Sequence, residues 1–339
     1  MSSPPTLNNV PAAANHGVYT AGEYRALTSA AGLRLLDDRI VIRVIGDDRV
    51  SFLHGMCSND IKALKPDGVM PALFLTERAH LIADCFMWGT GNDAILIEID
   101  RDEWPKVRSH LEHLLIADDV EMEEQTGLGV LDIEGPQAHE VLGAALGAAF
   151  DALQVWHQAT ASGLTVANLP RFGGPAITVI GERARLAQLA ADLRNSNPDL
   201  CEVHSDSLEI VRIENGVARV GVDSNDKTLA LEARLERAIS LNKGCYLGQE
   251  TVERATARGG LKKRLYGVRI NGARAPRRDA AIGLHGKEIG RLSSVARSPR
   301  LGLIGFAILH HSAWHDGLAV SVADADGELA ASVCDLPFK

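Results

Sequence analysis

The sequence predicts an α+β protein, with two α+β units of similar build followed by an all-β domain. Between residues 40 and 120, the apolar periodicity gives the order strand, helix, three strands, helix, strand. A similar cycle restarts at Gly129, and beyond Arg264 the chain changes to short alternating strands separated by glycine. The chain has 339 residues, of which 46% are hydrophobic, so it is long enough to bury a sizeable core and to divide into two or three domains.

The first α+β unit is expected over residues 21–128, after a loose tail at 1–20. Tyr24, Leu27, Ala31 and Leu35 lie at helical spacing. Asp47 or Asp48 can cap the next helix through a side-chain oxygen. The expected helices cover 21–36, from that cap to about Leu64, and 101–115, and the expected strands cover 40–45, 69–75, 81–88 and 93–99, with a short strand at Val120.

The second α+β unit is expected over residues 129–262, and an all-β barrel domain over 263–339. Asp206 and Glu209 form a capping box for a helix over 207–215, which Gly216 ends. The other expected elements are helices over 136–146, 182–194 and 229–240, strands at 129–133 and near 163 and 176, and barrel strands over 265–270, 281–284, 287–296, 302–309 and 318–334.

The composition excludes several classes of protein. No run of eighteen uncharged apolar residues occurs, and the first twenty residues lack the features of a secretion signal, so we expect a cytoplasmic protein without a membrane partner. The five cysteines include no C-x-x-C pair, which favours neither a disulfide framework nor a cysteine-rich zinc site. The formal net charge of -9 argues against a general nucleic-acid binder, because such proteins contact many phosphates.

The stretch Lys243–Glu250 combines a thiol, a cation and an aromatic ring with two glycines, which predicts a shaped loop. Cys245 is the candidate nucleophile, because Lys243 and one of Arg254 and Arg258 would stabilise its thiolate. The alternative is a buried structural cysteine, which is the interpretation given to Cys57 and Cys85. The basic run from Arg254 to Arg264 indicates a small anionic ligand, and Gly259-Gly260 within it speaks against an exposed helix.

Two carboxylates stand out. Asp84 lies in an apolar strand, where a buried carboxylate needs a partner, either at a site or in a structural hydrogen bond. Glu214 opposes the dipole at the end of its helix, and a carboxylate there can accept two parallel N–H bonds from a pterin-type ring. The alternative for Glu214 is a solvated side chain. The spacing of His310, His311 and His315 does not make a convincing metal set.

The run Lys243–Glu250 resembles the K-G-C-Y-x-G-Q-E signature of the YgfZ-type folate-binding proteins, relatives of the glycine-cleavage aminomethyltransferase (T-protein). Further support comes from Arg212-Ile-Glu214-Asn-Gly216, from Gly221-Val-Asp223, and from Ser58-Asn59-Asp60, which looks like the family's T-N-D turn. The resemblance covers roughly residues 35 to 335. Two departures occur: Cys245-Tyr246 stands where aminomethyltransferases usually have Asp-Phe, and Arg234 stands where the family often has glycine.

The resemblance implies two α+β folate-binding domains around a central channel, with a C-terminal β-barrel and tetrahydrofolate in the channel. It implies that Asp84 orients the folate nitrogen, that Glu214 holds the pterin and that Lys243 is a basic folate contact. Cys245 and Asp84 are therefore the candidate catalytic residues. The candidate cofactor-binding residues are Glu214, Lys243, Tyr246, Gln249, Arg254 and Arg258.

The implied function is that of a tetrahydrofolate-binding accessory protein in iron–sulfur cluster assembly or repair, with iron–sulfur client proteins of the radical-SAM type as partners. The enzymatic alternative is aminomethyl or methyl transfer between a small amine donor and tetrahydrofolate. A third interpretation is a folate-sensing scaffold, in which Cys245 serves only packing. The motif leaves open whether folate turns over.

Overall fold

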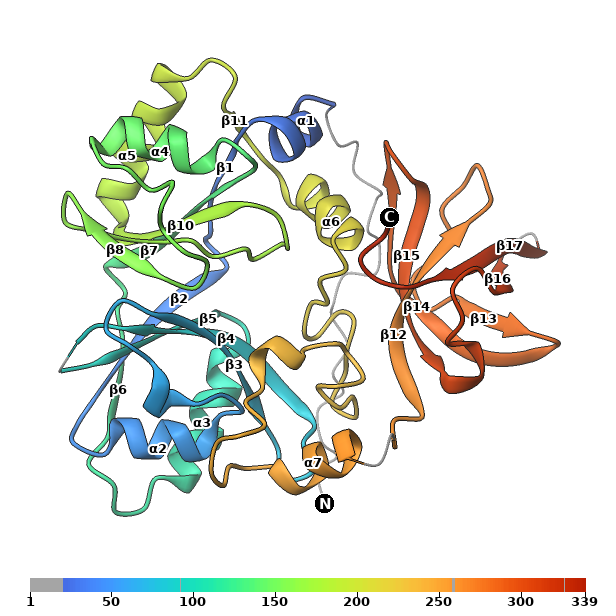
Figure 1. The fold of residues 1–339 in the computed structure, drawn as a ribbon, viewed down its shortest axis with the longest axis horizontal. Helices are drawn as coiled ribbons and strands as arrows, with labels where there is room; N and C mark the ends of the chain where they lie inside the picture. The colour runs from blue at the N-terminus through green and yellow to red at the C-terminus, as the bar shows by residue number, and fades with distance from the viewer. Residues whose placement is uncertain (1–20, 92, 258–259, 326) are drawn as a thin grey trace, which may run out of the picture.

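The computed structural model describes residues 21–91, 93–257, 260–325 and 327–339. These residues form a five-stranded sheet, a six-stranded sheet and a closed six-stranded barrel (Figure 1). The two mixed units and the barrel confirm the predicted fold class. Within the described residues, no helix is long and apolar enough to cross a membrane.

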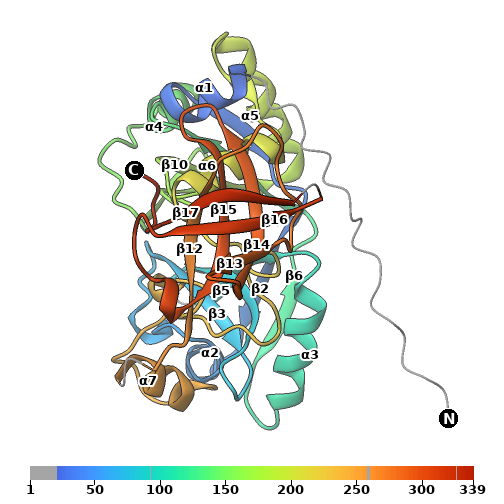
Figure 2. The ribbon, with the colours of Figure 1, turned by 90° about the vertical axis from the view of Figure 1, so that its right-hand side faces the viewer.

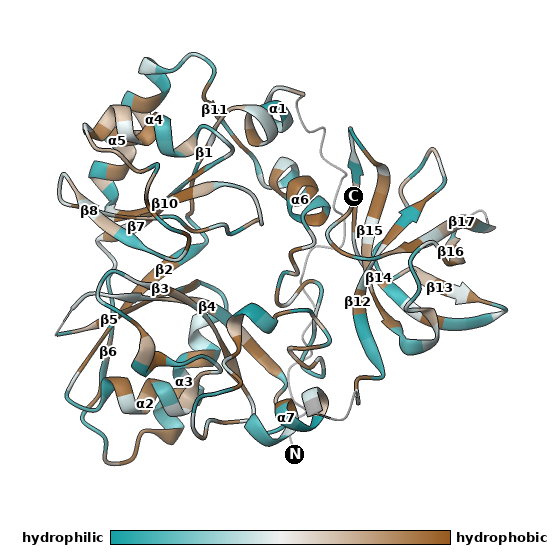
Figure 3. Cartoon of the chain, viewed as in Figure 1, coloured by the Kyte–Doolittle hydropathy of each residue, from teal (hydrophilic) through white to brown (hydrophobic). Residues whose placement is uncertain are grey.

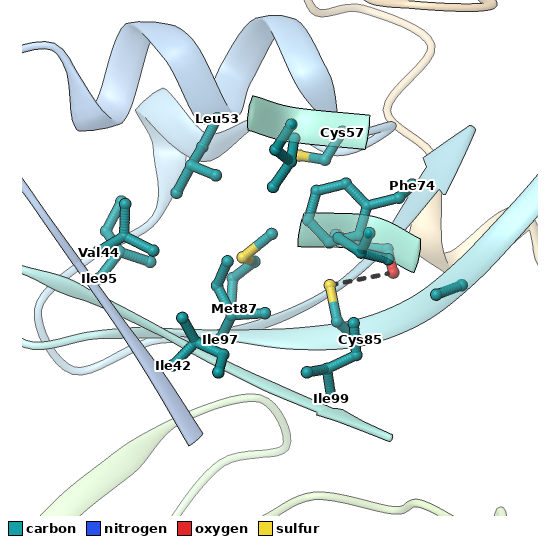
Figure 4. Packing of buried hydrophobic residues seen from close by; sticks show 14 of the residues in the cluster. Ile42, Val44, Leu53, Cys57, Phe74, Cys85, Met87, Ile95, Ile97 and Ile99 are labelled. Atoms are coloured by element: carbon teal, nitrogen blue, oxygen red, sulfur yellow. Dashed lines mark hydrogen bonds between the residues drawn. The ribbon is translucent and has the colours of Figure 1, made fainter. Parts of the chain in front are cut away.

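The five-stranded sheet belongs to the first unit, and every strand pair in it is antiparallel. Two helices cover one face and contribute Leu53 and Val107 to its apolar cluster. Figure 4 shows Leu53 with Ile42, Met87 and Ile97 in this cluster. The strand order is β3 (Val69–Leu75), β4 (Leu81–Gly89), β5 (Ile95–Asp100), β2 (Arg39–Ile45) and β6 (Glu121–Glu124), with helices α2 (Arg49–Met56) and α3 (Trp104–Leu114). This confirms the order strand, helix, three strands, helix, strand.

The six-stranded sheet forms the second unit, with two helices packed on one face. Leu142 and Leu193 of these helices contact Leu131 and Ile177 of the sheet. The sheet order is β11 (Cys201–Glu202), β1 (Gly32–Leu35), β7 (Leu128–Glu134), β10 (Ala176–Glu182), β9 (Leu164–Ala167) and β8 (Gln158–Ala161), and the helices are α4 (Ala138–Leu146) and α5 (Arg183–Ser196).

The two sheets pack against each other through their other faces. Phe86 and Trp88 of β4 share an apolar cluster with Val130 of β7 and Ile180 of β10. Brown hydrophobic residues accordingly run along the strands of both units in Figure 3. Strand residues that are buried on both faces explain why β4 and β10 read as nearly continuous apolar runs.

The expected helix over 21–36 is wrong in its second half. Helix α1 (Ala21–Ser29) ends early, and Gly32–Leu35 forms β1, which pairs with β7 and β11 of the second unit. A Cβ atom on Gly32 would lie 2.6 Å from a methyl carbon of Val203, so the strand needs glycine there. The segment 21–35 therefore crosses the expected boundary between the units.

Of two other expected helices, one is shorter than expected and the one over 229–240 does not form. Helix α2 ends at Met56: Cys57 is extended, Ser58 Oγ accepts a hydrogen bond from Leu73 N (2.9 Å), and a short 3-10 helix, η1 (Ile61–Ala63), follows. Residues 229–240 form turns with one 3-10 helix, η2 (Glu236–Ala238). Arg234 adopts a left-handed conformation, with a φ of 58°. This conformation explains why glycine would suit that position.

Helix α6 (Ser205–Glu214) lacks the expected capping box. It begins before Asp206, and Glu23 of α1 accepts hydrogen bonds from His204 N (2.9 Å) and Ser207 Oγ (2.7 Å) at this end. The carboxylate of Glu209 instead binds Arg212. Gly216, with a φ of 73°, follows the helix end, as expected.

The C-terminal domain is a closed barrel, as predicted, and Figure 2 shows it in front of both α+β units. Strand β12 closes it by pairing with both β15 and β17. Residues expected as one long strand at 318–334 form two. The barrel strands are β12 (Lys263–Ile270), β13 (Ala281–Leu284), β14 (Lys287–Ser298), β15 (Gly302–His310), β16 (Ala319–Asp324) and β17 (Gly327–Cys334).

A buried carboxylate fastens the barrel to α6. Asp223 accepts hydrogen bonds from Arg212 of α6 (2.6 Å), from Ser293 (2.5 Å) and Ser294 (2.6 Å) of β14, and from the backbone of Arg219 (3.0 Å). Arg212 and Asp223 are both 2% exposed. The R-x-E and G-V-D motifs thus contain a structural ion pair between these parts of the chain.

We predict that Arg212→Met will lower the free energy of unfolding by about 3 kcal/mol or more, because it leaves Asp223 buried without its charge partner. Arg291→Met removes an exposed ion pair with Glu288 and is expected to cost less than about 1 kcal/mol. Urea unfolding followed by circular dichroism measures both. Equal losses in the two variants would contradict the structural role of the buried pair.

Candidate functional site

Residues 243–248 form an irregular loop before helix α7 (Gln249–Ala257), which confirms the predicted shaped loop. Gly248 has a φ of 88°, and a Cβ atom there would lie 2.8 Å from the carbonyl oxygen of Thr76. Only glycine allows the loop to pack this closely on the turn between β3 and β4. The loop is therefore seated on the first unit.

Lys243 anchors this loop. Its side chain is buried, and Nζ donates hydrogen bonds to the backbone oxygens of Cys57 (2.7 Å), Asn59 (2.8 Å) and His54. Carbonyl groups at a helix end lack partners within the helix and attract a cation. All three N–H donors of the ammonium group are thus used, which leaves none for the expected direct contact with folate.

The same junction joins the two motifs that lie far apart in the sequence. Ser58 Oγ donates to the carbonyl oxygen of Ala238 (2.6 Å), and Ser240 N donates to Ser58 O (3.0 Å). Leu247 N donates to Gly55 O (3.1 Å). The Ser58-Asn59-Asp60 turn and the Lys243–Glu250 loop consequently form one structural unit at the end of α2.

Cys245 and Tyr246 have opposite environments. Cys245 is exposed, whereas Tyr246 is 8% exposed and packs with Leu73 and Ala238. Burial raises the pKa of Tyr246 to about 12, and the nearby Glu253 adds to this effect. The Tyr246 hydroxyl is buried without a hydrogen-bond partner among the described residues. The loop therefore presents its thiol outward and places its aromatic ring in the core.

The basic run does not gather around the thiol in the described part of the chain. Arg254 lies on the exposed helix α7 and pairs with Glu250, so the argument against an exposed helix is wrong for this residue. Gln249 donates to Glu253 on the same helix (2.5 Å). Arg258 lies outside the described residues.

Asp84 is half-buried on the face of β4 that carries Phe86. Arg237 of η2 lies close by: burial lowers the pKa of its guanidinium, and the charge of Asp84 opposes that shift. Arg237 also lies 6.0 Å from the ring centroid of Trp156. Trp156 in turn stacks on Phe86, with ring centroids 6.2 Å apart.

Arg237 and Trp156 were not among the residues predicted from the sequence. Each comes from a segment without a motif, and only the folded chain places both near Asp84. One signal was present: Arg237 is a cation between the apolar residues Leu235 and Ala238, in the stretch expected as a helix. From the sequence alone, Arg237 could not be distinguished from an ordinary solvated arginine on a helix surface.

A buried ion network lies behind Phe86 and joins the two sheets. Glu98 of β5 binds Arg39 (2.9 Å) and Arg171 (2.9 Å), and Arg171 also binds Asp132 of β7 (2.7 Å). Burial opposes the charge of Arg171, but Asp132 and Glu98 outweigh it and raise the pKa of this guanidinium. Both sheets are therefore held in a fixed relation beneath the candidate site.

Glu214 lies in a different contact set, where α1, α6 and the barrel meet. It is 4% exposed and accepts hydrogen bonds from Tyr24 (2.9 Å) and Ser298, with Arg300 at 3.6 Å. No described contact joins it to Asp84 or Lys243. The structure therefore groups Asp84 with Arg237 and Trp156, and ties Glu214 to the attachment of the barrel.

A cavity of about 380 Å³ lies beside the loop, and its lining includes Thr76, His80, His110 and Leu247. Despite the histidines, no group of three His, Cys, Asp or Glu side chains that could hold a metal ion occurs in the described ranges. The cavity shares the turn after β3 with Gly248 but contains neither Asp84 nor Arg237.

We predict that Lys243→Met will release the loop from α2, because three charge-assisted hydrogen bonds are lost at once. A loss of about 3 kcal/mol corresponds to a roughly hundredfold larger opening equilibrium of the loop. Thermolysin cleavage beside Leu241 or Leu247, followed by mass spectrometry, measures this opening. The matched control is Lys262→Met, at an exposed position outside the loop, and equal cleavage rates in the two variants would contradict the anchoring role.

Comparison with known proteins agrees with this architecture. Residues 11–171 match the family model described as the GCVT N-terminal domain, and residues 263–339 match the glycine cleavage T-protein C-terminal barrel domain. The tRNA-modifying protein YgfZ of Yersinia enterocolitica is 28% identical over 243 residues, which cover 71% of this chain and 72% of that protein.

A mitochondrial iron-sulfur cluster assembly factor IBA57 homolog of Mycosarcoma maydis is 25% identical over 242 residues, covering 67% of this chain and 54% of that protein. The solved structure of the glycine cleavage system aminomethyltransferase T from Bartonella henselae has the same fold, with a TM-score of 0.85 at 20% identity, over 94% of this chain and 88% of that one. The chain belongs to the glycine cleavage T-protein family, and its relatives are consistent with a YgfZ-type member of that family.

Proposed function

We propose that this protein binds tetrahydrofolate and acts as an accessory protein in iron–sulfur cluster assembly or repair. The observation that carries this proposal is the exposed thiol of Cys245 on a loop that buried Lys243 fixes to α2. A thiol that a rigid loop presents at the surface suits repeated contact with partner proteins. Two relatives named for tRNA modification and for iron–sulfur cluster assembly support this choice within the family.

The residues near Asp84 fit a folate-type ligand. A reduced pteridine presents N–H donors, which a half-buried carboxylate can accept, and its glutamate carries carboxylates, which a guanidinium can bind. Asp84 and Arg237 supply these two groups. The unpaired Tyr246 hydroxyl offers a further polar contact. Bound tetrahydrofolate would supply a carrier for one-carbon units.

Asp84 is the better candidate for the pterin contact. Glu214, which the resemblance also implies, would have to give up Tyr24, Ser298 or Arg300 to bind a ligand. In this proposal Lys243 acts as a positioning residue, and Cys245 meets an iron–sulfur client, of the radical-SAM type, at the surface. Gln249 and Arg254 lie on exposed α7, where they are available to the client.

We predict that Cys245→Ala will abolish rescue of iron–sulfur enzyme activity in a host that lacks its own relative of this protein. Calorimetry is expected to show that the same variant binds tetrahydrofolate within about twofold of the wild type, because the thiol lies outside the ligand contacts. Cys201→Ala is the matched control, at another cysteine that is not fully buried. Full rescue by the Cys245 variant would remove the thiol from the mechanism.

Aminomethyl transfer to tetrahydrofolate is the second candidate function. The shared fold of the Bartonella aminomethyltransferase and the half-buried Asp84 favour it, and the Cys245-Tyr246 pair in place of Asp-Phe counts against it. Turnover of a methylamine-loaded lipoyl carrier separates the two functions. Folate-dependent release of ammonia from that carrier would establish the transferase, and its absence alongside folate binding would favour the accessory role.

A further inference from the structure

We propose that Arg237 is the receptor for a carboxylate of the ligand, namely the glutamate tail of tetrahydrofolate, and that Trp156 is the residue that positions it. This inference rests on the proposed function, because it assumes a folate-type ligand beside Asp84. It places the anionic part of the ligand at Arg237, whereas the sequence suggested that the basic run from Arg254 to Arg264 meets an anion. Three independent features of the described residues support it.

The first feature is an unused set of donors. The guanidinium of Arg237 makes no hydrogen bond or ion pair with any other described residue, although it carries five N–H donors. Its side chain is exposed, yet surrounding protein lowers its pKa. Water therefore reaches a cation that has protein on most sides. By contrast, Arg39, Arg171 and Arg234 all bind carboxylates.

The second feature is a column of cations and rings that fixes Arg237. Arg171 lies 4.8 Å from the centroid of Phe86, Phe86 stacks on Trp156, and Trp156 lies 6.0 Å from Arg237. Arg171 is held at the buried end by Glu98 and Asp132. Cation–π contacts restrain a guanidinium without using its N–H groups. Arg237 is thus oriented in advance while its donors stay available.

The third feature is backbone strain at Trp156. Its φ of 66° lies in the left-handed region, which a bulky residue rarely adopts. Two hydrogen bonds hold it there: Trp156 N donates to Asn168 O (2.9 Å), and Val69 N donates to Trp156 O (2.8 Å). Such strain is retained at sites where a side chain must point in one direction. Here it places the indole ring between Phe86 and Arg237.

Asp84 completes the arrangement. Its charge acts on Arg237, and no ion pair within 4.0 Å joins these two described side chains. A pterin on Asp84 and a carboxylate on Arg237 would let one ligand satisfy both groups. Because neither group has a hydrogen-bond or ion-pair partner in the described chain, binding need not break such a contact, unlike binding at Glu214 or Lys243.

The test compares two ligands by calorimetry: tetrahydrofolate, and tetrahydropteroate, which lacks the glutamate. A charge-assisted bidentate contact is worth about 1.5 to 3 kcal/mol, so Arg237→Gln is expected to weaken tetrahydrofolate binding roughly 10- to 100-fold. Tetrahydropteroate binding is expected to stay within about twofold. Arg237→Lys keeps the charge but loses the planar guanidinium, so its affinity for tetrahydrofolate is expected to lie between those of the wild type and Arg237→Gln. Trp156→Leu is expected to weaken only tetrahydrofolate.

A control variant, the wild type and a variant of the basic run distinguish the possible outcomes. Arg108→Gln removes an exposed arginine that pairs with Glu112 on α3 and is expected to change neither affinity. If the wild type binds neither ligand, the proposed function itself fails. If the wild type binds tetrahydrofolate and Arg237→Gln binds it equally well, or weakens both ligands equally, only the present inference is overturned. If Arg254→Gln instead weakens binding of tetrahydrofolate but not of tetrahydropteroate, the basic run is the receptor for the glutamate tail.

Discussion

The placement of the site depends on one buried ammonium group. Lys243 donates hydrogen bonds to three backbone carbonyl oxygens where α2 ends, and this contact fixes the path of the chain from η2 to α7. With the loop fixed, Tyr246 fills the apolar cluster beside β3, and Cys245 is turned to solvent. A helix end that lacks partners and a loop that carries a cation thus satisfy each other. The family motif couples a structural anchor to an exposed thiol.

The residues that attach the barrel to α6 differ from those that we assign to the ligand. Arg212, Asp223 and Glu214 belong to motifs that suggest ligand contacts, yet Arg212 and Asp223 pair with each other, and both carboxylates bind serines of the barrel. Asp84, Arg237 and Tyr246 are among the described residues whose polar side-chain atoms make no hydrogen bond or ion pair. Polar groups that protein surrounds normally find partners, so Asp84 and Arg237, which lie close together without one, are the groups to which we assign the ligand.

Periodicity predicted most of the longer strands and the barrel well, because strands such as β2, β4 and β10 bury at least one face. It failed where tertiary contacts overrode local pattern. Gly32–Leu35 became a strand because β7 and β11 flank it, and residues 229–240 became turns because Arg234 adopts a positive φ. Cys245 and Asp84 could be predicted as candidates from their neighbours in sequence. Arg237 and Trp156 could not be predicted, since the role we assign to them depends on the stacking of Phe86, Trp156 and Arg237, which only the folded chain creates.

We propose that a folate-type ligand binds where β4, the segment before β8 and η2 meet. Hydrogen exchange with and without tetrahydrofolate tests it most directly, because it locates the ligand without any substitution. We expect the ligand to slow exchange in peptides covering residues 154–158 and 235–240, with no change at residues 271–280 of the barrel. Protection confined to the barrel or to α7, with none at these two segments, would contradict it.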